Sequence, residues 1–118
     1  ELHGLDQAAA QSGPAVIARV VPPCGETLVA MARASDRVTR LRDGRFGVLL
    51  READADGAGH FAARAVAACD PWLAAMPWPI ELRVGWASPD GAEDLTGALR
   101  IAEQRLAAQT TRPHGDLP

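Results

Sequence analysis

The sequence has few of the residues on which metal centres, disulfide frameworks and membrane spans depend. It contains two cysteines, three histidines and no tyrosine, and Cys24 and Cys69 stand in no metal-binding spacing. We therefore predict no metal site and no cofactor, and we expect two free thiols in a reducing compartment. No apolar run approaches the ~20 residues that a membrane-spanning helix needs, and no signal peptide is visible.

These absences predict a cytoplasmic domain that makes no membrane contact of its own. A length of 118 residues fits one domain with a substantial core. Because the chain starts at Glu1 rather than at Met, we expect it to be part of a longer protein, which could itself be anchored in a membrane.

The charge balance excludes one class of partner. A net charge of −3 gives no electrostatic basis for binding a nucleic-acid backbone. Basic residues nevertheless gather in one stretch, at Arg33, Arg37, Arg40, Arg42 and Arg45. On charge alone, this cluster is equally well interpreted as a site for one small anionic ligand or as a solvated, arginine-rich hairpin.

A β-hairpin is the strongest structural signal in the sequence. Residues 38–42 and the apolar run 46–50 flank Asp43-Gly44, a pair typical of a type I′ turn, in which both central residues need positive φ. The turn carries a single carboxylate, where a catalytic hairpin would need several.

The rest of the chain predicts strands and helices around this hairpin. We expect strands at 15–21 and 80–87, and helices at 26–34, from Asp54 or Asp56 to about Cys69, and after Asp94, with a loop at 70–79. The last helix would present one apolar stripe of Leu95, Leu99, Ala102 and Leu106. The order β-α-β-β-α-β-α predicts an α/β (α+β) fold with a single mixed, mostly antiparallel sheet and helices packed on its faces. Residues 1–13 would form an N-terminal segment, 14–109 the domain and 110–118 a flexible tail.

The hairpin and the residues before it resemble the GGDEF domain of diguanylate cyclases. Arg33, Asp36 and Arg40 match the family pattern R-x-x-D-x-x-x-R without a gap, whereas the signature pentapeptide GGDEF reads Arg42-Asp43-Gly44-Arg45-Phe46. Weaker matches follow the family order over roughly residues 14–109. They are Gly25-Glu26-Thr27-Leu28 with G-D-x-L, Leu82 to Ala87 with S-x-G-x-A, and Ala102-Glu103 with A-D.

The resemblance implies that catalysis has been lost. The family joins two GTP molecules into cyclic di-GMP and holds magnesium with carboxylates of the first strand and of the signature. Here no acid occurs between Ala8 and Gly25, and the acidic pair of the signature falls on Gly44 and Arg45. Arg42 and Asp43 replace the glycines that let the backbone approach the phosphates. We therefore predict that the chain is not an enzyme.

A second site of the family, which binds cyclic di-GMP as an inhibitor, is matched better. The resemblance places Arg33, Asp36 and Arg64 in it, because Arg64 falls at the family position of the second arginine. An arginine can donate to guanine O6 and N7 together, and an aspartate can accept from the guanine N1–H. Arg37 or Arg40 would help to neutralise the phosphates. The plainer alternative is that Arg33 and Asp36 form only a surface ion pair worth less than ~1 kcal/mol.

These observations leave several functions open. The first is an inactive GGDEF-like receptor for cyclic di-GMP that regulates other domains of its parent protein or a second copy. The alternative is a nucleotide-free interaction or dimerisation module, which an apolar patch around Trp72, Trp78 and Trp86 would favour. Residual GTP binding at the hairpin ranks third and an active cyclase fourth.

Overall fold

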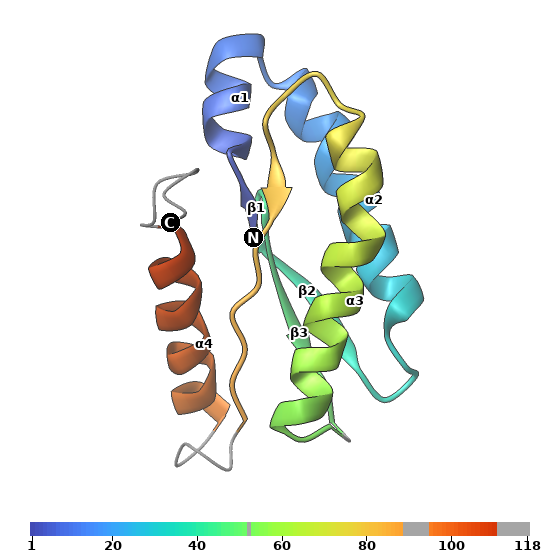
Figure 1. Ribbon diagram of the computed structural model, residues 1–118, viewed down its shortest axis with the longest axis vertical. Helices are drawn as coiled ribbons and strands as arrows, with labels where there is room; N and C mark the ends of the chain where they lie inside the picture. Colours follow the sequence, from blue (N-terminus) through green and yellow to red (C-terminus); the bar gives the residue numbers. More distant parts are fainter. Residues whose placement is uncertain (52, 89–94, 111–118) are drawn as a thin grey trace, which may run out of the picture.

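The computed structural model describes residues 1–51, 53–88 and 95–110. Within these residues the chain is a mixed α+β protein with four helices and two small antiparallel sheets, which confirms the predicted fold class (Figure 1). The helices are α1 (Leu5–Ser12), α2 (Ala15–Met31), α3 (Ala55–Ala74) and α4 (Leu95–Thr110), and the strands are β1 (Leu2–His3), β2 (Arg37–Arg42), β3 (Arg45–Leu49) and β4 (Glu81–Leu82).

The strand predicted at residues 15–21 is wrong, because this segment begins the long helix α2. The helix continues through Pro22 and Pro23 and absorbs most of the helix predicted at 26–34. Its buried residues are Val16, Val20, Val21, Cys24 and Leu28. This spacing of three to four residues lines one helical face, and burial of that face outweighs the preference of β-branched residues for strands.

Helix α3 begins as predicted and ends later. The Asp54 carboxylate accepts a hydrogen bond from the Gly57 N–H at 2.9 Å, so Asp54 is the N-cap. The helix continues past Cys69 and through Pro71 to Ala74, and the predicted loop at 70–79 is therefore shorter. Proline is accepted late in the helix here even though it donates no hydrogen bond to the preceding turn.

Two free thiols lie in the contact between α2 and α3. Cys24 and Cys69 are both completely buried. A hydrogen bond with Cys69 and burial both raise the pKa of the Cys24 thiol, while the same hydrogen bond lowers the pKa of Cys69 against the effect of burial. Burial disfavours the thiolate form of both cysteines, because a thiolate in this apolar core would lose its hydration.

The single sheet predicted from the sequence is divided into two. The hairpin is confirmed as β2 paired with β3, but β4 covers two residues instead of 80–87 and pairs with β1. The register of that second sheet matches Leu2 with Leu82 and His3 with Glu81. The division arises because the segment expected to give the first strand is helical, and the short β1 takes its place beside β4.

The N-terminal segment is part of the core rather than an appendage. Leu2, Leu5 and Ala8 are buried in the same cluster as the apolar faces of α2 and α3. Gly4 enters α1 with φ of 93°, and a side chain there would collide with the Pro79 carbonyl. Residues 1–13 therefore connect the helical layer to β4.

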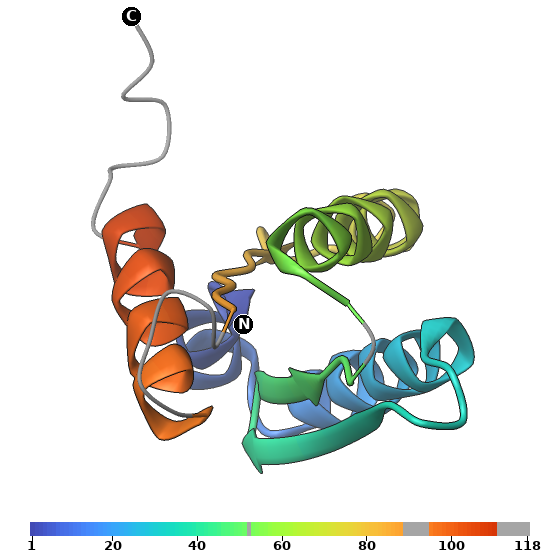
Figure 2. The same cartoon turned by 90° about the horizontal axis from the view of Figure 1, so that it is seen from below.

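Helix α4 stands on the far side of residues 83–88 from the pair α2–α3, as both views show (Figures 1 and 2). The Gln109 amide donates to the Val84 carbonyl, and the Arg105 guanidinium donates to the Trp86 carbonyl, each at 2.7 Å. Leu106 is buried, but Leu95 and Leu99 are 53% and 47% exposed, so only part of the predicted stripe is covered. The predicted cap Asp94 and residues 111–118 of the predicted tail lie outside the described residues.

Candidate functional site

Asp36 fastens the two ends of the hairpin. Its Oδ2 accepts from the backbone N–H of Arg33 at 2.8 Å, and its Oδ1 accepts from the backbone N–H of Arg51 at 3.3 Å. The turn before β2 is thereby joined to the chain that follows β3. The predicted pair of Arg33 and Asp36 is therefore linked through the backbone of Arg33, and the exposed guanidinium of Arg33 is left out of this link.

The third predicted ligand residue lies on α3. Arg64 is exposed, and its guanidinium lies 5.8 Å from the centre of the Phe61 ring. Among the described residues, no hydrogen bond or ion pair joins its side chain to Arg33 or Asp36. Binding of one ligand by these three side chains stays a prediction.

The supporting arginines differ from each other. Arg40 forms an ion pair with Asp43 at 3.2 Å. Within the described residues, the Arg37 side chain makes only a long hydrogen bond, 3.5 Å, to the backbone carbonyl of Asp36. The guanidinium of Arg37 is therefore the better placed of the two to meet a phosphate.

The hairpin turn differs from the predicted type I′. Only Gly44 has positive φ, 78°, and no residue other than glycine in the described chain does, so Asp43 cannot adopt that turn. The register shifts by one residue between Arg40 and Arg42, which is a β-bulge. A side chain on Gly44 would lie 2.7 Å from Leu5, and the Gly44 carbonyl accepts from the Leu2 N–H at 2.6 Å. The turn is therefore packed against the N-terminal segment at Gly44.

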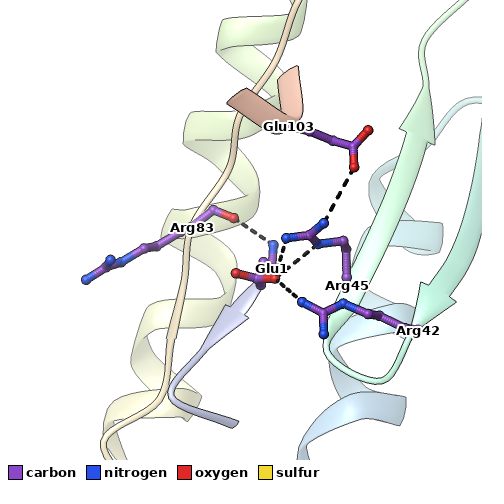
Figure 3. Close-up of polar contacts among 5 residues, drawn as sticks. All are labelled: Glu1, Arg42, Arg45, Arg83 and Glu103. Atoms are coloured by element: carbon purple, nitrogen blue, oxygen red, sulfur yellow. Dashed lines mark hydrogen bonds and ion pairs between the residues drawn. The ribbon is translucent and has the colours of Figure 1, made fainter. Parts of the chain in front are cut away.

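An ionic network holds this turn to β1 and α4 (Figure 3). The Glu1 carboxylate accepts from Arg42 at 2.9 Å and from Arg45 at 2.8 Å, and Arg45 also faces Glu103 at 3.6 Å. Burial raises the pKa of the Glu1 carboxyl, but the hydrogen bond and charge of Arg45, with smaller effects of nearby cations, hold it below its ordinary value of 4.5. Sequence reasoning missed Glu1 and Glu103, because no local pattern relates positions so far apart.

An apolar groove of about 890 Å³ lies between the hairpin, α3, α4 and residues 82–88. Its apolar lining includes Phe46, Val48, Phe61, Trp86, Leu95 and Leu99. Trp86 is 38% exposed, whereas Trp72 and Trp78 are half-buried against the core. The exposed apolar side chains at this groove are thus those of Leu41, Trp86, Leu95 and Leu99, and not the three tryptophans together.

In the part of the chain that the structure describes, no group of three potential metal ligands is found, and no helix combines the length and apolar character needed to cross a membrane. No family model, no curated protein and no solved structure matches this chain. The resemblance to GGDEF domains therefore depends on the motifs in the sequence alone.

Proposed function

We propose that this chain is a non-catalytic regulatory domain that binds cyclic di-GMP at Arg33, Asp36 and Arg64 and acts on an attached domain or a second copy. The main support is the fixed position of Asp36, whose two oxygens accept from the backbone N–H groups of Arg33 and Arg51, on either side of the hairpin. A cytoplasmic location is part of this proposal. It agrees with the two free, buried thiols.

The chemistry of the turn is compatible with a purine ligand. A carboxylate has about four acceptor positions, so Asp36 can accept from a guanine N1–H while it keeps both backbone hydrogen bonds. The exposed guanidinium groups of Arg33 and Arg64 are available to pair with or stack on a base. Arg64 already lies over an aromatic ring, Phe61, which shows the kind of stacking that a guanine would offer.

The binding test is calorimetric titration of the full chain with cyclic di-GMP. We expect binding to the wild type and its loss in Arg33→Ala and in Arg64→Ala, with the fold checked by circular dichroism. Arg100→Ala removes an exposed arginine of α4 and is the matched control. No heat and no thermal shift for the wild type would refute the proposal.

The absence of cyclase activity is a second part of the proposal. Arg45 occupies a position where the family carries an acid, and its charge is directed to Glu1 and Glu103. A cation there would repel magnesium. Formation of cyclic di-GMP from GTP and magnesium by the purified chain would refute this part.

The alternative function is a nucleotide-free interaction or dimerisation module, and the groove favours it. Leu95 and Leu99 of α4 are about half exposed beside Trp86. Adjacent exposed apolar side chains of this kind are typical of binding surfaces. Leu99→Glu should abolish association with an attached domain or a second copy without changing nucleotide binding, because it lies on α4 and not at the Asp36 turn.

A further inference from the structure

The short strand β1 contacts both sheets. It pairs with β4 on one side, and its Leu2 N–H donates to the Gly44 carbonyl of the hairpin on the other. In Figure 1, β3 and residues 83–88 continue below β1 as separate segments. The groove is lined by both of those segments.

Both sides of the groove present strand edges. Among the described residues, β3 makes backbone hydrogen bonds only with β2. On the opposite side, Arg83 exchanges both backbone hydrogen bonds with Glu1, at 2.7 and 2.9 Å. Alternate residues of an extended chain direct their N–H and C=O groups to the same edge. Gly85 therefore presents its backbone to the groove, while the carbonyls of Val84 and Trp86 face α4.

We infer that this groove is a slot for one extended peptide segment of a partner protein, inserted in line with β1 between β3 and residues 83–88. Only an extended polypeptide can pair with unsatisfied backbone groups on two sides at once. Residues 75–80 of a second copy are unsuited to this role, because Pro77 and Pro79 lack the N–H that pairing needs.

The lining specifies the side chains of the partner. Phe61 and Ala62 of α3 are buried residues that also line the groove, so the segment needs apolar side chains at alternate positions. Three carboxylates of the lining already have partners, because Glu1 and Glu103 pair with Arg45 and Asp54 caps α3. Arg37 and Arg51 line the same groove, and neither forms an ion pair with a carboxylate of the described residues. The intervening positions should therefore be acidic. The partner segment alternates apolar and acidic residues.

The inference is tested with the intact chain and synthetic peptides of roughly eight residues, a common strand length. A peptide of alternating Val and Glu should bind, and it should slow amide hydrogen exchange at Gly85 and along β3. Replacing every Glu by Lys should weaken binding by at least about tenfold, as should N-methylation of alternate backbone amides, since each loss of a hydrogen bond or charge pair is worth about that factor. These controls leave the protein unaltered.

Three results would overturn the inference. They are no binding of the Val–Glu peptide, binding without protection of Gly85 and β3, and equal binding of the Lys peptide. Sedimentation equilibrium of the protein alone adds a fourth, because a dimer that the peptide dissociates would make a second copy the natural occupant. The inference deepens the interaction role above. If a peptide with helical apolar spacing binds the groove, the extended-peptide inference is refuted while the interaction function stands. Failure to bind cyclic di-GMP would refute neither of these two hypotheses.

Discussion

Replacing Gly85 by alanine should destabilise the protein, because no space exists for the added methyl group. The new Cβ would collide with the Ala102 carbonyl and lie 2.7 Å from the Leu106 backbone nitrogen of α4. Backbone atoms of a helix cannot move aside as a flexible side chain can, so α4 must shift as a unit. Overpacking of this kind costs about 1–3 kcal/mol. At about 4 °C per kcal/mol, Tm should fall by roughly 4–12 °C.

Gly59→Ala is the matched control and should change stability in the opposite direction. Gly59 lies inside α3, and the nearest atoms to an added Cβ, in the Trp86 ring, are at the ordinary contact distance of 3.5 Å. Alanine in a helix interior is favoured over glycine by about 1 kcal/mol. Both variants are measured by thermal and urea unfolding followed by circular dichroism. If Gly85→Ala is as stable as the wild type while Gly59→Ala is stabilised, α4 does not pack against residue 85.

Three more predictions follow from the hydrogen bonds and the core. Asp36→Ala should lower the free energy of unfolding by about 1–3 kcal/mol in urea, because it leaves the N–H groups of Arg33 and Arg51 without their acceptor; unchanged stability would mean that the two ends of the hairpin are not joined. The folded pKa of Glu1 is below its ordinary 4.5, so the stability it contributes is complete above that pH and is lost as the pH falls through the folded pKa. Glu1→Gln should therefore destabilise the protein at pH 7 and have a much smaller effect at pH 3, and an equal effect at both would contradict the ionic network. Finally, Cys24 and Cys69 should react slowly with a thiol reagent in buffer and rapidly in urea, because both are fully buried; fast reaction in buffer would exclude the packing of α2 on α3.

Local signals in the sequence predicted the elements whose determinants lie within a few residues. The hairpin follows from Asp43-Gly44 between two strand-like runs, and the start of α3 follows from a capping carboxylate, predicted as Asp54 or Asp56 and found to be Asp54. The last helix follows from its apolar spacing. In each case the residues that decide the structure are neighbours in the chain.

Residues 15–21 were assigned wrongly because two local signals disagreed. The β-branched residues and the flanking prolines indicated a strand, while the spacing of Val16, Val20 and Cys24 fitted a helix. Helical spacing prevailed because the apolar surface of α3 lies opposite that face and covers it. A surface supplied by residues 61–73 is not visible in a window around residue 18, and the division of the sheet follows from the same error.

The candidate site was also predicted only in part, because one of its contacts depends on residues far apart in the sequence. The positions of Arg33, Asp36 and Arg64 came from a motif, but the motif did not show that Asp36 is bound by the N–H of Arg51. That contact forms only when β2 and β3 pair and bring the two ends of the hairpin together. It gives Asp36 a structural role whether or not a nucleotide binds, so only variants of the arginines can test the ligand site without disturbing the fold.

The departure from the GGDEF signature has a structural consequence as well as a chemical one. An acid at position 45 would stand beside Glu1 and Glu103, and three carboxylates with only Arg42 left to offset their charge would repel one another. With Arg45 there, the hairpin is attracted to β1 and α4 at the same place, so the residue that does not fit the GGDEF signature also holds the two sheets together. Arg45→Glu should therefore not restore a metal site. It should separate the hairpin from α4, and the matched variant Arg45→Lys, which keeps the charge, should largely preserve the stability measured in urea.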